Sequence, residues 1–414
     1  MKDNILKDPL QDYLSMSIRR EKSWISENME SYIPMSLSHS IALGKKIIND
    51  NKDHLVDDDL KEGLGKILEA TTKKYKIFTE MASKHLDLYY NDGIGIEVAH
   101  QPKFMGGERF VFNKLALGSS LANLDEKFYP LFYLADYDKV HGELTKTHFS
   151  LVNSSSGFPC SINPEIEKKY FGTSIREIPL PSKIHLDESL QQIFDNYQFS
   201  INSCLNDAFH RKLLEERLED ALRLIKQGYY RSKTYNDWFI NIAGTISNIF
   251  NDQGYLFIFS SDDGYRKLLT PVYEQILGER EKYLSLYVKL LSDFEKNGLN
   301  APLRHVHDDF VPFFYECPEK KCNRMRIQLK AETAGSMVIL QGKCENCGFD
   351  LEIITNARKP DLSEHSMHLT PRVETRQYLV AKTLQPAIHV SGTGETRYYT
   401  MSIPLLEKFD PNAI

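Results

Sequence analysis

The chain has 414 residues, which exceeds one ordinary domain and predicts two or three structural units. Hydrophobic residues make up 41% of it, enough for real cores, and the net charge of −6 argues against a protein that coats nucleic acid nonspecifically. Because the N-terminus is polar and no run of about 18 apolar residues occurs, we expect a cytoplasmic protein without a membrane segment.

The first 90 residues predict a helical N-terminal region. From Asp58 to Tyr90, apolar side chains recur at helical spacing, which predicts one long amphipathic helix packed against the core. We assign no chemistry to this region.

A strand, a glycine turn and a helix follow. Ile94 to Ala99 is a short apolar run typical of a buried parallel strand, and His100, Gln101 and Pro102 end it. Gly106 and Gly107 allow a tight turn before a helix that contains Lys114 and ends near Leu121. Such a turn favours an anion, although it matches neither the P-loop nor the dinucleotide fingerprint. The alternative is an ordinary turn in which His100 caps the helix or the loop.

A second strand is predicted from Tyr129 to Ala135, with Asp136 and Asp138 directly after it. Ligands of open α/β sheets bind beyond the carboxyl ends of the strands, so these carboxylates could hold Mg²⁺, an amine or a ribose hydroxyl. A solvated turn with an N-capping aspartate is the alternative.

The middle of the chain predicts further alternation of helices and strands. Residues 153–182 are rich in Ser, Pro and Gly and predict irregular structure, whereas 190–250 predicts helix with a break near Gly228. A third strand, Gly254 to Ser260, precedes a long helix that ends near Lys296. Strands that alternate with helices predict an α/β fold with a parallel sheet.

Four of the six cysteines have the spacing of a metal site. Cys317 and Cys322 form a C-x4-C pair, and Cys344 and Cys347 form a C-x2-C pair after 21 residues that predict two strands. Two such turns predict a zinc ribbon in which four thiolates close the coordination sphere of a structural zinc ion. Free or redox-active cysteines are the alternative. Four basic residues beside the cysteines leave contact with nucleic acid open: Lys320, Lys321, Arg324 and Arg326.

The last segment predicts a second phosphate-binding turn. A helix from Glu374 to Lys382 and a strand from Pro386 to Val390 precede a loop of small and hydroxyl residues, which comprises Ser391, Gly392, Thr393 and Gly394 and continues into Glu395. Backbone N–H groups of such a loop can surround an anion, and Glu395 could act in acid–base chemistry. With the turn after His100, this loop predicts a two-sided cleft.

In their order along the chain, these blocks resemble the cysteine ligase family of bacillithiol biosynthesis. The resemblance covers residues 90–410 and rests on these segments: His100-Gln101-Pro102 with Gly106, Gly107 and Lys114; Phe132 to Asp138; Thr234 to Phe250; Gly254 to Leu268; Arg372; and Gln385 to Glu395, with Thr393 where the family usually has Pro.

The resemblance implies a Rossmann-like core related to nucleotidylyltransferases and an ATP-dependent ligase that adds cysteine to glucosaminyl-malate. The carboxylate must be activated, usually as an acyl-adenylate or acyl-phosphate, before the amine attacks. The resemblance places His100, Gln101, Gly106, Gly107 and Lys114 at the nucleotide with Mg²⁺. It places Asp136 and Asp138 at an amine, a sugar hydroxyl or Mg²⁺, and the loop from Ser391 to Glu395 on the other side of the cleft.

The chain also departs from the family pattern. It contains the predicted zinc ribbon, and it ends at Ile414, where the family continues with another core segment and a coiled coil, so we expect a shortened C-terminus with a possible partner chain. The predicted units are 1–90, helical; 91–309, the α/β core with a helical insert; 310–356, the ribbon; and 357–414, a return to the core. The alternative functions are a nucleotidyl or aminoacyl transferase acting on RNA or another acceptor, and a non-catalytic zinc-ribbon binding protein.

Overall fold

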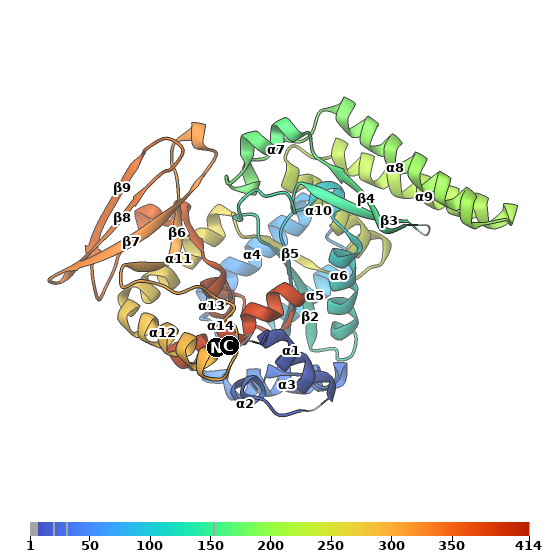
Figure 1. Cartoon of the computed structure of the whole chain (residues 1–414). Coiled ribbons are helices and arrows are strands. Elements are labelled where there is room, and N and C mark those ends of the chain that lie inside the picture. The colour runs from blue at the N-terminus through green and yellow to red at the C-terminus, as the bar shows by residue number, and fades with distance from the viewer. Residues whose placement is uncertain (1–6, 20, 30–31, 152–153, 414) are drawn as a thin grey trace, which may run out of the picture.

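A four-stranded parallel sheet forms the centre of the molecule. The computed structural model describes residues 7–19, 21–29, 32–151 and 154–413. The sheet has the order β11-β1-β2-β5, and its strands are β1 (Ile94–His100), β2 (Phe128–Leu134), β5 (Leu256–Phe259) and β11 (Pro386–Val390) (Figure 1). Every residue of β1 and β2 is buried, which explains their continuous apolar sequences. The predicted α/β class with a parallel sheet is confirmed.

Helices cover both faces of this sheet. Ile96 and Val98 of β1 face a layer that contains α3 (Leu37–Asp50), α6 (Arg109–Ala122) and α10 (Tyr235–Gly244). Leu131 and Tyr133 of β2 face the opposite layer. That layer comprises α4 (Asp58–Lys74), α5 (Glu80–Tyr90), α11 (Asp263–Gly278) and α13 (Val373–Thr383). The alternation of side chains along each strand therefore builds two separate cores.

The N-terminal region is helical, but its long helix is interrupted. The chain forms α1 (Pro9–Leu14), α2 (Trp24–Met29) and α3 before α4. The predicted single helix over 58–90 is wrong, because α4 ends at Lys74 and Lys76 adopts a left-handed φ of 57°. Thr79 then caps α5 by accepting the Ala82 N–H. Helices α1 and α2 contact the last helix, α14 (Thr393–Phe409), which also packs on α12 (Arg280–Lys296).

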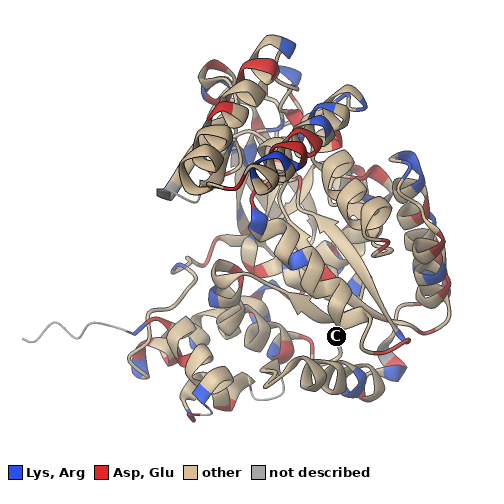
Figure 2. Ribbon diagram, turned by 90° about the vertical axis from the view of Figure 1, so that its right-hand side faces the viewer, with Lys and Arg blue, Asp and Glu red and all other residues tan. Residues whose placement is uncertain are grey.

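The helical insert projects from the body as a hairpin of α8 (Lys183–Cys204) and α9 (Ala208–Tyr230) (Figure 1). The predicted break near Gly228 is confirmed, because α9 ends at Tyr230 and α10 begins at Tyr235. Gly228 itself lies in the last turn of α9. A Cβ there would lie 2.9 Å from Ile242, so the glycine allows α10 to approach. Residues 153–182 are less irregular than predicted, since β3 (Lys146–Leu151) pairs with β4 (Ser154–Ser161) ahead of α7 (Pro164–Tyr170). Basic and acidic residues are interspersed along α9 (Figure 2).

A second, antiparallel sheet lies beside α11 and α12 (Figure 1). Its order is β10-β6-β7-β8-β9, with β6 (Phe310–Glu316), β7 (Arg326–Ala334), β8 (Met337–Lys343), β9 (Asp350–Asn356) and β10 (Leu369–Pro371). Strands β7 and β8 coincide with the two strands predicted between the cysteine pairs. Among the described residues, no helix is long and apolar enough to cross a membrane.

Candidate functional site

The candidate site lies at the carboxyl ends of β1 and β11. From β1 the chain proceeds to β2 and β5 on one side, whereas β11 pairs with the other side of β1. The direction of the connections therefore changes between β1 and β11. In open α/β sheets, ligands bind at this switch point. His100 ends β1 and Ser391 follows β11, so the two loops predicted to form a cleft do meet at one edge.

An ion pair joins these two loops. Lys114 of α6 and Glu395 of α14 approach to 2.5 Å between Nζ and Oε2, and the Lys114 ammonium also donates to the Ala99 carbonyl at 3.2 Å. The Lys114 side chain is only 4% exposed, whereas that of Glu395 is 23% exposed. Burial lowers the pKa of Lys114, and the neighbouring Glu395 opposes that shift. Lys114, which was predicted to contact the nucleotide, thus brings a positive charge to the switch point.

Two helix N-termini converge on the same edge. Phe110, in the first turn of α6, lies so close to Gly392 that a Cβ at that glycine would be 2.3 Å from the ring. The Glu395 carboxylate accepts the Gly392 N–H and so caps α14. Thr393 and Gly394 begin that helix and are exposed, and a Cβ at Gly394 would meet nothing within 4 Å. The positive ends of both helix dipoles thus lie close together at this end of the sheet, which favours an anion there.

His100 is a neutral hydrogen-bond acceptor at this edge. Its Nδ1 lies 2.7 Å from the Gln101 carbonyl oxygen. Because a carbonyl only accepts, Nδ1 carries the proton and Nε2 presents its lone pair. Burial, followed by the nearby Lys114 charge, lowers the pKa of His100 to about 4. No described residue hydrogen-bonds to Nε2, which leaves that atom for a ligand.

The glycine turn differs from the predicted anion cradle. Gly106 and Gly107 both have a φ of 84°, as a tight turn requires. Their N–H groups, however, donate to the carbonyls of Lys103 and Phe104, at 3.3 and 3.0 Å. A Cβ at Gly106 would lie 2.7 Å from Ile242. These glycines therefore shape the turn and let it pack on α10, and their N–H groups are already used. Likewise, the Ser391 hydroxyl lies 2.8 Å from that of Thr396.

The two predicted aspartates have different surroundings. Asp136 is buried, and its carboxylate accepts from Ser260 Oγ at 2.7 Å, Ser261 N at 2.9 Å and Asn236 Nδ2 at 2.8 Å, as well as from the Ser261 hydroxyl. Burial raises the pKa of Asp136, and the two serine bonds oppose the shift. This carboxylate ties β2 to β5 and α10.

Asp138 is partly exposed and faces the edge of the site. Its Oδ2 accepts from Gln101 Nε2 at 3.0 Å, and its Oδ1 lies 3.2 Å from Arg326 Nη1. The side chain of Asp138 is 25% exposed. The structure therefore brings Asp138 and Gln101 together beside His100, and it connects both to the antiparallel sheet.

A buried polar network close to the candidate site was not predicted from the sequence. Glu97 of β1 forms an ion pair with Arg376 of α13 and accepts from His389 Nδ1 of β11 at 2.5 Å. Arg376 also donates to the Tyr399 hydroxyl at 2.8 Å, and Gln377 contacts the His389 ring at 2.8 Å. The Arg376 and His389 charges lower the pKa of Glu97 to about 2, against the effect of burial. Glu97 was the available signal, because it is a charged residue in the middle of an apolar strand.

The four cysteines predicted to bind zinc form a single cluster. Cys317, Cys322, Cys344 and Cys347 have all their sulfur atoms within 4.8 Å of one another. Cys317 Sγ lies 3.7 Å from Cys347 Sγ, and Cys344 Sγ lies 3.9 Å from Cys322 Sγ. A tetrahedral zinc with bonds of about 2.3 Å requires sulfur separations of about 3.8 Å. The cluster therefore fits zinc.

The cysteines come from two turns of the antiparallel sheet. Cys317 follows β6 and Cys322 ends a short 3-10 turn (Lys320–Cys322), while Cys344 and Cys347 lie between β8 and β9. Burial raises the pKa of the Cys322 thiol to about 11, so a bound cation must displace its proton. Because four thiolates leave no open position, such a metal would be structural.

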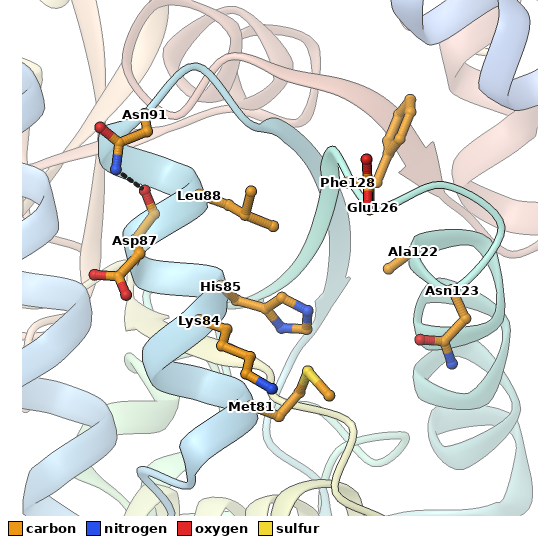
Figure 3. Close-up of a pocket in the computed structure, with 10 residues that line it drawn as sticks. All are labelled: Met81, Lys84, His85, Asp87, Leu88, Asn91, Ala122, Asn123, Glu126 and Phe128. Atoms are coloured by element: carbon orange, nitrogen blue, oxygen red, sulfur yellow. Dashed lines mark hydrogen bonds between the residues drawn. The ribbon is translucent and has the colours of Figure 1, made fainter.

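A cavity of about 540 Å³ lies near the amino end of β2, at the opposite end of the strands from the switch point (Figure 3). It is bounded by α5 on one side and by the end of α6 and the start of β2 on the other, where Ala122 and Phe128 lie. The His85 ring points into it, while His85 Nδ1 contacts the Gly254 carbonyl at 2.8 Å. The cavity is thus separate from the switch point, and none of the predicted catalytic or binding residues lines it.

Comparison with known proteins identifies the family. The family model described as bacillithiol biosynthesis BshC, N-terminal Rossmann-like domain, matches residues 27–412. No curated protein matches the chain. The match spans the central sheet, the helical insert, the cysteine-bearing sheet and the last helix, which is most of the described structure. The chain therefore belongs to the BshC family of bacillithiol biosynthesis enzymes.

Proposed function

We propose that the chain is an ATP-dependent carbon–nitrogen ligase that joins cysteine to the amine of glucosaminyl-malate. The observation that carries this proposal is the edge between β1 and β11. There Lys114, the N-termini of α6 and α14, and His100, to whose Nε2 no described residue hydrogen-bonds, lie at the same end of the sheet. Family membership supports a role in bacillithiol synthesis, and this edge supplies groups that suit the chemistry.

The cationic part of the edge suits the nucleotide. A free carboxylate has a poor leaving group, so a ligase must first transfer a phosphoryl or adenylyl group to it. Lys114 and the N–H groups at the start of α14 offer positive charge and donors to phosphate oxygens. Mg²⁺, as the metal of such nucleotides, would use carboxylate oxygens such as those of Asp138.

The neutral imidazole suits the attacking amine. With a pKa of about 4, His100 is unprotonated at neutral pH, and its Nε2 can accept a hydrogen bond from an amine. That bond would orient the nitrogen lone pair toward the activated carboxyl carbon. Asp138 and Gln101, which are hydrogen-bonded to each other beside His100, offer an acceptor and a donor for sugar hydroxyls.

The test is a mixed assay on purified, zinc-loaded protein with ATP, Mg²⁺, cysteine and glucosaminyl-malate. Mass spectrometry would follow the joined thiol together with AMP or ADP. We expect the thiol and one of the two nucleotides to appear in equal amounts. Release of either nucleotide without the thiol would support ligase chemistry but reject glucosaminyl-malate as the acceptor. No product from folded protein would reject the proposal.

A matched pair of histidine variants tests the site. His100→Ala should abolish turnover while the protein stays folded, because the acceptor at the edge is lost. His305→Ala is the control, since the His305 side chain is 77% exposed and lies near Glu295, away from the edge. Equal activity of the two variants would remove His100 from the mechanism.

A further inference from the structure

We propose that the four-cysteine metal site positions Asp138 and Gln101 in the candidate functional site, and that Arg326 connects the two sites. The proposal rests on the proposed function in that it takes the candidate functional site as the catalytic one. The metal cluster would then be more than a support for its own sheet. It would hold one wall of the site in place.

The first step is the turn after Cys322. Asn323 and Arg324 have φ values of 47° and 54°, so two consecutive non-glycine residues are left-handed. Such residues adopt this conformation only at a cost. The turn is held by Cys322, whose carbonyl accepts the Met325 N–H at 3.0 Å, and by Cys317, whose N–H donates to the Met325 carbonyl at 2.9 Å. Ligation of both sulfurs by one ion would fix the two cysteines, and with them the turn.

The second step is the direction that this turn gives to Arg326. Arg326 begins β7, four residues after Cys322, and its side chain reaches back to the central sheet. Its Nη1 lies 3.2 Å from Asp138 Oδ1, and its Nη2 donates to the Tyr137 carbonyl at 3.1 Å. The guanidinium lies over the Tyr137 and Phe314 rings, 5.2 and 5.1 Å from their centres. This side chain therefore holds both the backbone and the carboxylate of the loop after β2.

The third step is the far side of Asp138. With Oδ1 facing Arg326, Oδ2 accepts from Gln101 at 3.0 Å. Gln101 directly follows His100, and its carbonyl sets the His100 tautomer. Displacement of Arg326 would free Asp138, and then the Gln101 side chain, beside the reacting groups. Arg326 would not contact the substrate itself. Replacement of a residue that orients site residues in this way weakens the site.

A second set of contacts holds the turn after Cys322 against the core. Glu316 precedes Cys317, and its buried carboxylate forms a two-fold pair with Arg266 of α11, at 2.8 and 3.0 Å. Arg324, in the same turn as Asn323, donates to Glu316 at 3.0 Å and lies 3.2 Å from Glu177. Since α11 follows β5, the cluster is anchored to the same edge of the central sheet from two directions.

The first experiment needs no activity. Hydrogen exchange of residues 135–141 is compared in zinc-loaded protein, in protein treated with a chelator, and in zinc-loaded Arg326→Gln. We expect exchange to rise by about tenfold in the last two samples, since both release the Asp138 loop. Unchanged exchange in the chelated protein, with its zinc shown to be absent, would overturn the proposal even if the chain proves to be a ligase.

The second experiment uses kinetics with a control on the same strand. Arg326→Gln should lower kcat/KM by about tenfold or more while zinc content stays the same, and Arg326→Lys should recover part of it. Lys330→Gln is the control, because Lys330 of β7 is 70% exposed and pairs with Asp309 at the surface. If Arg326→Gln and Lys330→Gln had equal kcat/KM, Arg326 would have no positioning role. A chain without ligase activity would leave the exchange result as the deciding one.

Discussion

Glu395 and Lys114 connect the first and last parallel-sheet segments of the fold across the switch point, through a 2.5 Å contact between a half-buried carboxylate and a buried ammonium. They are 281 positions apart in the sequence. The contact explains why a loop at the C-terminus and a helix near residue 114 can act as one site.

This relationship predicts unequal costs for removing either partner. Glu395→Gln leaves the buried Lys114 cation unpaired and should lower the free energy of unfolding by about 3 kcal/mol. Lys114→Met leaves the more exposed Glu395 carboxylate, which water can reach, and should cost less. Urea unfolding of both variants measures the difference.

The double variant Lys114→Met with Glu395→Gln completes this comparison. It removes both charges, so we expect stability close to that of the original protein. A loss in the double variant equal to the sum of the two single losses would show that the two side chains do not interact.

His100 should make stability depend on pH. Its pKa in the folded protein, about 4, is below the usual 6.5, so the unfolded chain takes up a proton first as the pH falls. The favourable contribution is complete above pH 6.5 and is lost as the pH falls toward 4, by at most about 3 kcal/mol. His100→Asn, whose amide can still donate to the Gln101 carbonyl, should show a smaller loss between pH 7 and pH 4.5. Identical pH profiles would contradict the lowered pKa.

Asp136 should behave as a structural residue. Asp136→Asn replaces an acceptor of four hydrogen bonds with a group that must point an NH₂ at one of its donors, and it should cost about 2–3 kcal/mol of stability. Asp138→Asn should change stability little, because that carboxylate is partly exposed, and should lower activity. Thermal unfolding with parallel activity assays separates the two. Loss of activity in a fully stable Asp136→Asn protein would instead show that Asp136 takes part in catalysis.

Nucleotide binding should occur without proton uptake at pH 7. His100 is neutral there, and in this account it meets the amine while Lys114 meets the phosphates. Calorimetric titration of ATP in buffers with different ionisation enthalpies should give the same heat. A buffer-dependent heat that corresponds to about one proton, absent in His100→Asn, would place the imidazole on the phosphate instead.

The sequence predicted the strands better than the helix ends. The apolar runs around Ile96, Phe132 and Ile388 became β1, β2 and β11 because they are covered on both faces by helices. The break after α4 was missed because the apolar spacing continues through Lys76, whose left-handed backbone carries no sequence signal. The close packing of Gly228 against Ile242 was not predicted, because it is a contact between different helices.

The sequence pointed to candidate site residues but not to the contacts that connect them. Spacing alone pointed to the four cysteines, since their ligand geometry is local to two turns. His100 and Glu395 became candidates because polar residues follow apolar strands. The Arg376 contact with Glu97 and the Arg326 contact with Asp138 join residues far apart in the chain, so only the folded structure reveals them.

The most direct test of the site is cysteine-dependent nucleotide release by the Lys114→Met, Glu395→Gln variant, once its stability has been shown to match that of the original protein. The original protein, supplied with ATP, Mg²⁺, cysteine and glucosaminyl-malate, should release AMP or ADP together with the joined thiol. The variant should release neither, because the switch point has lost its cation and the carboxylate paired with it. A variant that is folded and fully active would show that the reaction takes place elsewhere in the molecule.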